Sequence, residues 1–302
     1  MKILSLFLVA LAVCSGALTF LIAEPSPARA DDPHPETLRV LTYNTWFTFN
    51  EQKAKARGIQ LIKNETPDIT VLQELVDIQP DLLQSLSESW GHPHSSLQKT
   101  KGYSVGVTSR WPIQVIEKVV TDQGHGYLHV VIKEIHVFAI HLHPFGHGKR
   151  QREADVLIKK IIPLLKERKK VIVAGDFNAH SEDDAKLLYA QPQLLKNYKD
   201  SDAKHGLNNL RDGKFDFQVM NTFFKAGLID SSRKLLAKTT AARTTYGDPA
   251  KTGQRIDFIL TDPALFKTVQ SSKVIIPEAF NGPAISDHYP VVSDFGSPVA
   301  KE

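Results

Sequence analysis

The sequence predicts one α/β domain built on stacked β-sheets, and three observations support this class. The chain has 302 residues, of which 42% are hydrophobic and 23% charged, a composition typical of a globular protein. Short apolar runs typical of strands are mixed with a few segments of helical periodicity. No repeat, low-complexity tract or linker interrupts residues 38–296, so we expect a single domain there. A polar tether at 31–37 would precede it, and a tail at 297–302 would follow.

The N-terminal segment has a different character. Lys2 precedes an uncharged, mostly apolar stretch at 3–23, and an Ala-x-Ala sequence ends at Ala30. This pattern resembles a signal peptide at 1–30 and predicts export to the periplasm or the extracellular space. The alternative is a membrane anchor, because residues 3–23 are long enough to span a bilayer. Cleavage would lower the net charge from +4 to +3, because the segment carries two basic residues and one acidic residue, and would remove the single cysteine, Cys14.

The first half of the domain reads as strands with two helices between them. Alternating strand-forming residues predict strands over Leu38–Asn44 and Asp68–Glu74. Apolar residues at helical spacing predict helices over Glu51–Asn64 and Asp81–Trp90. Four further strands follow with short gaps, which predicts antiparallel neighbours. These strands cover Gly102–Ser109, Ile113–Val120, Tyr127–Glu134 and Ile135–His143.

The second half begins with a helix over Arg150–Arg168, where Pro163 predicts a kink or an early end. A buried strand then runs from Val171 to Gly175 and is followed at once by Asp176, and Ser181 with Asp184 resembles a capping box that starts another helix. An irregular segment is expected over Pro192–Gly213, followed by a helix over Phe217–Ala226 that ends at Gly227. The last predicted strands cover Arg255–Asp262, Lys273–Glu278 and Tyr289–Phe295.

Several predicted strands end on acid, amide or imidazole side chains. Alone, an Asn or Asp at the end of a strand is typical of a turn, and a strand histidine is typical of a packed polar residue. Their repetition indicates one rim where strand ends gather polar groups over a pocket. The residues are Asn44, Glu74, His141, His143, Asp176, Asn178, Asp257, Asp287 and His288.

These residues lie in blocks that resemble the endonuclease/exonuclease/phosphatase superfamily, which includes secreted deoxyribonucleases, abasic-site endonucleases, inositol-polyphosphate phosphatases and sphingomyelinases. The resemblance spans residues 38–295 and implies a four-layer α/β/β/α sandwich with two mixed β-sheets packed face to face. The blocks occur in the family's order: TYNTW, LQEL, GVTSRWPI, IHLHP, GDFNAH, TTYGD, RIDFIL and SDHYPV.

The resemblance also implies a metal site. Phosphoester hydrolysis needs charge relief at the phosphate and at the leaving oxygen, and Mg²⁺, with Mn²⁺ as an alternative, supplies both through oxygen ligands. Glu74 matches the family's principal metal ligand. The amide oxygen of Asn44 would complete an adequate site, and Asp287 would contribute directly or through water.

The remaining residues receive catalytic roles from the same resemblance. Asp176 would orient and deprotonate the attacking water, and Asn178 would either donate to a phosphoryl oxygen or hold Asp176 in place. His288, kept protonated by Asp257, would stabilise charge on the phosphoryl group. His141 would contact the scissile phosphate. The roles of His143 and His147 stay open between the pocket, a second metal and a structural hydrogen bond.

We therefore expect a metal-dependent phosphodiesterase that acts on a phosphate-containing substrate, either nucleic acid or a phospholipid head group. Basic residues between 149 and 170 favour a nuclease, although they are also typical of a solvated helix face. Trp46 stands where abasic-site endonucleases carry an acidic residue, which disfavours a role in DNA repair. We expect a monomer without an obligate protein partner.

Three alternatives remain open on the sequence. A sphingomyelinase-like lipid phosphodiesterase and a phosphomonoesterase would use the same strand-end residues. A non-catalytic binding module on the same fold would have lost part of the site, yet Glu74, Asp176 and His288 are all present.

Overall fold

The computed structural model describes residues 37–121, 124–233, 235, 240–277 and 284–296. The predicted signal peptide, the alternative anchor at 3–23, the tether up to residue 36 and the tail at 297–302 lie outside the described residues, and the domain limits stay a prediction. Within the described ranges, no helix combines the length and apolar character needed to cross a membrane.

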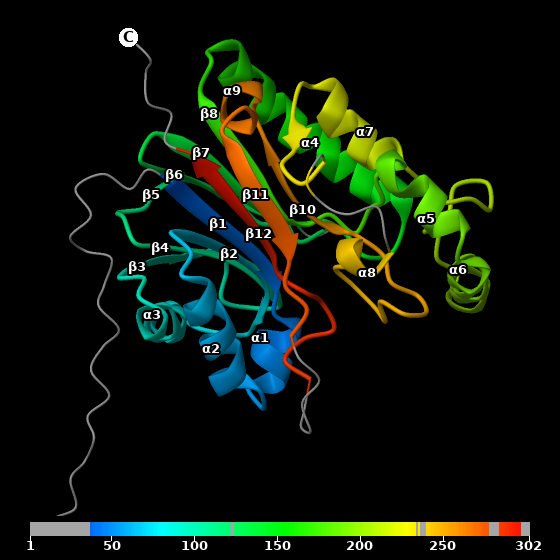
Figure 1. The fold of residues 1–302 in the computed structure, drawn as a ribbon, viewed down its shortest axis with the longest axis horizontal. Coiled ribbons are helices and arrows are strands. Elements are labelled where there is room, and N and C mark those ends of the chain that lie inside the picture. Colours follow the sequence, from blue (N-terminus) through cyan, green and yellow to red (C-terminus); the bar gives the residue numbers. More distant parts are fainter. Residues whose placement is uncertain (1–36, 122–123, 234, 236–239, 278–283, 297–302) are drawn as a thin grey trace, which may run out of the picture. The chain divides into compact units, whose positions relative to one another are not determined.

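Two six-stranded sheets form the centre of the fold (Figure 1). Most neighbouring strands are antiparallel, but β1 and β2 pair in parallel, and so do β7 and β8. Both sheets are therefore mixed, as predicted. In spatial order the first sheet contains β11 (Val269–Val274), β12 (Val291–Gly296), β1 (Thr37–Asn44), β2 (Ile69–Val76), β4 (Tyr103–Ser109) and β3 (His94–Leu97), and the second contains β5 (Gln114–Val119), β6 (Tyr127–Ile132), β7 (Ile135–His141), β8 (Lys170–Asp176), β10 (Asp257–Thr261) and β9 (Ile229–Asp230).

The two sheets pack face to face, and helices cover the outer face of each. Because strand side chains alternate between faces, Val40 of β1 lies in the core between the sheets, whereas Leu41 packs under α2 (Lys55–Glu65) and α3 (Pro80–Ser89). On the second sheet, Phe138 and Phe258 pack against α4 (His147–Lys166) and α7 (Gln218–Lys225). The predicted α/β/β/α layering is confirmed.

Several predicted elements differ from the structure. The segment over Pro192–Gly213 is not irregular, because α6 (Pro192–His205) fills most of it and ends at Gly206 in a left-handed cap. This helix buries little besides Leu194, so its apolar stripe is too weak to recognise. The remaining short helices are α1 (Trp46–Glu51), the 3-10 turn Glu182–Asp184, α5 (Ala185–Tyr189), α8 (Thr240–Arg243) and α9 (Pro263–Phe266).

Three local predictions are wrong in whole or in part. Strands β4 and β5 belong to different sheets, so the short gap between them carries the chain across the sandwich instead of closing a hairpin. Helix α4 does not end at Pro163 but continues to Lys166. Ser181 does cap the next helical turn, because its hydroxyl accepts from the backbone N–H of Asp183, but Asp184 does not complete a capping box and its carboxylate pairs with the buried guanidinium groups of Arg243 and Arg255.

The pairing of the strands brings the polar strand ends to one edge. His141 at the end of β7 lies beside Asp176 in the parallel ladder, and Asp257 at the start of β10 lies beside Asp176 in the antiparallel ladder. Gly175 has φ of +147°, and a Cβ there would overlap the carbonyl oxygen of Ile140. The glycine therefore permits the close approach of β7 and β8 just before Asp176.

Candidate active site

All the predicted site residues gather at this edge. A cavity of about 1050 Å³ opens there, and the residues that line it include Glu74, His141, Asp176, Asn178 and His288, with Asp287 beside them. Asn44 and Asp257 lie immediately behind this surface, where they contact the lining residues. Asn44 at the end of β1 contacts Asp176, and His288, three residues before β12, contacts Asp257, so this edge of the first sheet meets the second sheet at the site.

Asp176 is the most connected group of the site. Its side chain is almost fully buried, and its Oδ1 accepts a 2.7 Å hydrogen bond from the backbone N–H of Asn178. Its Oδ2 accepts from Asn44 Nδ2 at 3.1 Å and lies 3.5 Å from Nε2 of His141. Burial, followed by the charge of Asp257, raises the pKa of Asp176 to about 8. The carboxyl can therefore exchange a proton near neutral pH.

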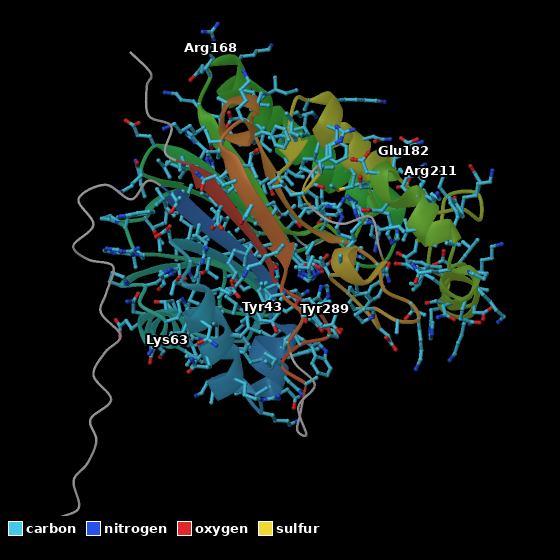
Figure 2. All side chains as sticks on the ribbon, viewed as in Figure 1. Tyr43, Lys63, Arg168, Glu182, Arg211 and Tyr289 are labelled. Atoms are coloured by element: carbon cyan, nitrogen blue, oxygen red, sulfur yellow. The ribbon has the colours of Figure 1, made fainter. Side chains whose placement is uncertain are left out.

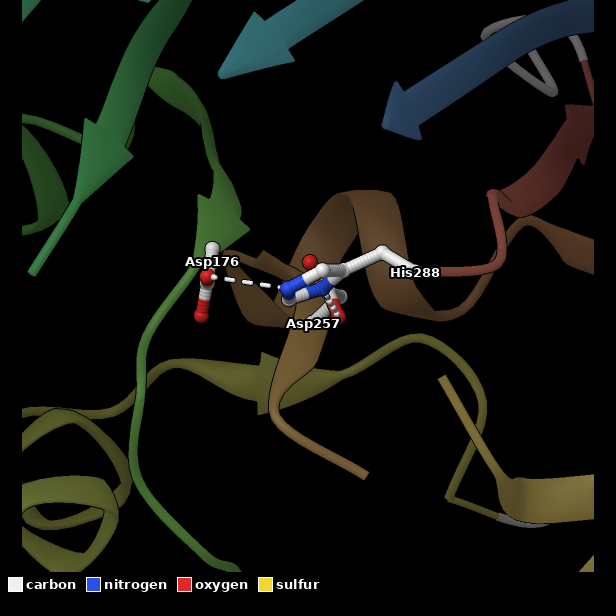
Figure 3. A group of neighbouring side chains, drawn as sticks. All are labelled: Asp176, Asp257 and His288. Atoms are coloured by element: carbon white, nitrogen blue, oxygen red, sulfur yellow. Dashed lines mark hydrogen bonds and ion pairs between the residues drawn. The ribbon is translucent and has the colours of Figure 1, made fainter. Parts of the chain in front are cut away.

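His288 lies between Asp176 and Asp257, as Figure 3 shows. Its Nδ1 donates to Asp257 Oδ2 at 2.9 Å, and its Nε2 lies 3.8 Å from Asp176 Oδ2. Burial acts to lower the pKa of His288, but the charge and hydrogen bond of Asp257 outweigh it and raise the pKa to about 10. The imidazole is thus protonated at neutral pH, which accounts for the carboxylate inside the apolar strand β10.

Glu74 occupies an irregular position in its strand. The pairing of β2 with β4 shifts register between Leu72 and Leu75, and Glu74 takes a left-handed φ of +55°. This bulge turns the carboxylate into the cavity. Its Oε1 accepts a weak hydrogen bond from Asn44 Nδ2 at 3.4 Å, whereas its buried Oε2 has no hydrogen-bond partner among the described residues. Burial raises the pKa of this carboxyl.

A divalent cation fits these residues. A buried carboxylate oxygen without a donor is costly unless a cation or a proton compensates it, and hard cations prefer such oxygens. Asp287 is close enough to raise the pKa of Glu74 further, and burial raises the pKa of Asp287 itself. Two carboxylates that share one cavity in this way form a reasonable magnesium site.

The side-chain amide of Asn44 does not present its oxygen to the metal site as predicted. Its nitrogen faces the carboxylates instead. Its Nδ2 donates to the carboxylates of Asp176 and Glu74, and its Oδ1 accepts from the backbone N–H of Trp46 at 3.1 Å. Since that partner can only donate, the orientation of the amide is determined. Asn44 therefore orients two carboxylates in this structure, and its role as a metal ligand stays a prediction.

The cluster of Asp176, Asp257 and His288 also has the composition of a metal site, because one ligand atom from each lies within 4.8 Å of the others. A protonated imidazole has no lone pair to give to a metal. The raised pKa of His288 therefore favours a hydrogen-bonded charge relay at these three residues.

His141 packs against a residue that sequence reasoning missed. Its ring stacks in parallel on His125 at 4.2 Å between ring centroids, and burial lowers its pKa well below the usual value. A neutral His141 contacts Asp176 through Nε2–H. His125 follows a segment without a motif, so nothing in the sequence marked it. Nδ1 of His143 accepts from the backbone N–H of Phe145, which favours the structural role and leaves the hydrogen of the neutral ring on Nε2, 3.3 Å from Nζ of Lys149.

Two more residues support His288. The hydroxyl of Ser286 accepts from the backbone N–H of His288 and donates to the carbonyl of Asn44 at 2.7 Å, which ties the segment before β12 to the end of β1 in the first sheet. The ring of Tyr246 lies 4.7 Å from the His288 ring. Both residues stand in blocks that the sequence singled out, TTYGD and SDHYPV, so their location was recognisable although their roles were not.

Comparison with known proteins identifies the same fold. An AP endonuclease from Archaeoglobus fulgidus aligns with a TM-score of 0.62 and 20% identity over 85% of this chain and 99% of that one. The 3′-5′ exonuclease NExo from Neisseria meningitidis gives 0.64 and 20% over 86% and 100%. A structure titled as the 3′ phosphatase NExo from Neisseria, bound to product DNA hairpin, gives 0.62 and 19% over 85% and 99%.

At these identities the structural likeness establishes the fold alone. The sequence itself matches the Endonuclease/Exonuclease/phosphatase family over residues 41–288, which is most of the chain and includes every predicted site residue. The chain therefore belongs to the endonuclease/exonuclease/phosphatase family and is a metal-dependent hydrolase of phosphoester bonds.

Proposed function

We propose that this chain is an exported, Mg²⁺-dependent phosphodiesterase that cleaves nucleic acid. One observation carries the chemistry: protonated His288, held by Asp257, faces Asp176 in the same cavity as the unpartnered Oε2 of Glu74. A proton donor, a proton acceptor and a cation-binding oxygen are thus assembled around a space that accommodates a phosphodiester.

The residues divide the reaction among themselves. Asp176 accepts a proton from the attacking water, and its raised pKa makes the ionised carboxylate a stronger base than an ordinary aspartate. His288 donates a hydrogen bond to the phosphoryl oxygens as their charge grows. Asn178 holds Asp176, because its backbone N–H donates to Asp176 and its side chain donates to the carbonyl of Leu142. Glu74 and Asp287 would hold Mg²⁺, which when bound neutralises the phosphate and the leaving oxygen.

Aromatic side chains in the cavity favour nucleic acid over a simple ester. Tyr103 and Phe145 are 37% and 56% exposed, and both line the cavity, as do Trp46 and Phe47. Exposed aromatic rings beside a phosphate site offer surfaces on which bases can stack. The likeness to an AP endonuclease and to a phosphatase bound to a DNA product agrees with this substrate class.

The basic residues at 149–170 form less of a nucleic-acid-binding surface than their number indicates. Figure 2 shows Arg168, beyond the end of α4, far from Tyr43 and Tyr289, which adjoin Asn44 and His288 in the chain. Arg150 is buried and Lys160 pairs with Glu117, whereas Lys149 lines the cavity. The helix therefore supplies a local cation at the site instead of a continuous basic surface.

Export is part of the proposal and rests on the sequence pattern of residues 1–30. Expression of the full chain in a bacterial host should yield a mature protein in the periplasm or the medium whose N-terminus is Asp31. N-terminal sequencing and mass measurement of the purified protein give the result. An intact Met1 in the membrane fraction would contradict cleavage and support the anchor at 3–23.

Hydrolysis of a substrate panel tests the activity. With Mg²⁺, the wild-type protein should cleave plasmid DNA or RNA and bis(p-nitrophenyl) phosphate, and EDTA should abolish both activities. Asp176→Ala should lower kcat by about 10²–10⁴-fold, because the water loses its proton acceptor. Asp212→Ala, at an exposed turn, is the matched control. Activity on sphingomyelin or on a phosphomonoester alone would contradict the nuclease proposal, and equal turnover by Asp176→Ala would contradict the mechanism.

Glu74→Gln tests the metal site. The substitution keeps the shape of the side chain and removes its charge, so the Mg²⁺ concentration that gives half-maximal activity should rise by at least about tenfold. Titration of activity with Mg²⁺ measures this change. Glu88→Gln, an exposed position on α3, should leave the Mg²⁺ requirement unchanged. An unaltered Mg²⁺ requirement in Glu74→Gln would place the metal elsewhere.

Asp257→Asn tests the protonation of His288. Only the protonated imidazole donates to the phosphoryl group, so wild-type activity should fall as pH rises through the His288 pKa of about 10. Removing the charge of Asp257 lowers that pKa, so the alkaline fall should move toward the ordinary histidine value of about 6.5. Profiles of kcat/KM against pH for both proteins measure the shift. Identical alkaline limbs would show that His288 does not act as the proton donor.

A further inference from the structure

One wall of the cavity comes from α6 and the loop after it. Leu194, Asn197, Tyr198 and Ser201 follow the spacing of one helix face, and all four line the cavity. Asn209 from the following loop and Gln254 from the segment before β10 continue this wall. The wall is uncharged and rich in carboxamides, and none of the catalytic roles described above uses it.

Asn209 presents a fixed hydrogen-bond donor. Its Oδ1 accepts from the backbone N–H of Gly146 at 3.0 Å and from the guanidinium of Arg150 at 3.1 Å. Both partners can only donate, so this end of the amide must be the oxygen. Its Nδ2 has no hydrogen-bond partner among the described residues. The carboxylate of Asp202 accepts from the backbone N–H of Asn209 and so holds the loop in place.

Gln254 repeats the arrangement. Its Oε1 accepts from the hydroxyl of Tyr198 at 2.8 Å and, in the tautomer of His180 that carries its hydrogen on Nε2, from that nitrogen at 2.6 Å, although both partners, unlike those of Asn209, are also able to accept. The residue is 6% exposed, and its Nε2 likewise has no partner in the described part of the chain. The side-chain oxygens of Asn209 and Gln254 are thus already hydrogen-bonded within the protein. Their amide N–H groups remain able to donate to a ligand in the cavity.

Positive charge lies behind and beside these donors. Arg150 is 3% exposed and forms no ion pair with any described carboxylate, although it donates to the carbonyls of His143 and Pro144. Burial lowers its pKa, and the charges of Asp216, Asp176 and Glu153 offset this effect only in part. Lys149, the next residue, is exposed and lines both the main cavity and an adjoining one of about 540 Å³. Donor groups backed by cations are complementary to an anion.

We propose that Asn209, Gln254 and Lys149 form a second anion subsite, which binds a phosphate group of the substrate next to the scissile one. The inference rests on the proposed function, because a polynucleotide carries such a flanking phosphate. The catalytic residues act on one phosphodiester. The subsite makes the enzyme prefer substrates that carry a second phosphate next to it.

Asn209→Asp is the sharpest test. The aspartate keeps an oxygen for Gly146 and Arg150, replaces the donor with a negative charge, and gives Arg150 a counterion. The melting temperature should therefore stay the same or rise. Affinity for tripolyphosphate, measured by calorimetry in EDTA, should fall by at least about tenfold. The ratio of kcat/KM for pTpT to that for TpT should fall by a similar factor, mainly through KM for pTpT.

Asn208→Asp is the matched control, because it adds the same charge at the adjacent exposed position. Screening by solvent should keep its tripolyphosphate affinity within about twofold of wild type. Gln254→Glu, which also keeps its acceptor oxygen, should weaken tripolyphosphate binding as Asn209→Asp does. Wild-type affinity in Asn209→Asp, or equal losses in Asn209→Asp and Asn208→Asp, would overturn the subsite. If wild type hydrolyses neither dinucleotide and cleaves neither plasmid DNA nor RNA, the nuclease proposal fails, while the tripolyphosphate measurement still decides on the subsite.

Discussion

The ladder between β8 and β10 is the constraint on which the site depends. It places Asp257 directly beside Asp176, so that two almost fully buried carboxylates lie side by side at the cavity. Two such groups cannot both be charged there without a cation. His288 supplies this positive charge, because its protonated ring lies between the two carboxylates. Ser286 and Asn44 then connect this ionic group to the first sheet, which brings Glu74 to the same cavity.

Much of the fold and of the site could be predicted from local patterns. Apolar runs that end in Asn, Asp or His mark strands whose ends face a ligand, and Asn44, Asp176 and His141 all follow this rule. Their common edge follows from the parallel pairs β1 with β2 and β7 with β8. The family resemblance implied the pairing of Asp257 with His288, and chemistry adds only that a carboxylate inside an apolar strand requires some partner.

Other features depend on contacts that a sequence does not display. A four-residue gap fits a hairpin as well as a crossing between sheets, so the separation of β4 from β5 was missed. The run of basic residues at the start of α4 gave no sign that Arg150 points inward while Lys149 stays exposed. The stack of His125 on His141 depends on tertiary packing, and the reversed amide of Asn44 depends on the turn at Trp46.

The way α6 is attached has an evolutionary consequence. The helix and its loop contact the rest of the domain through side chains and short loop contacts, and no ladder of a β-sheet runs through them. Insertions or replacements there leave the paired strands that carry Asp176 and Asp257 untouched. Substrate preference can therefore diversify among descendants of one ancestor while the bond-breaking apparatus is inherited without alteration.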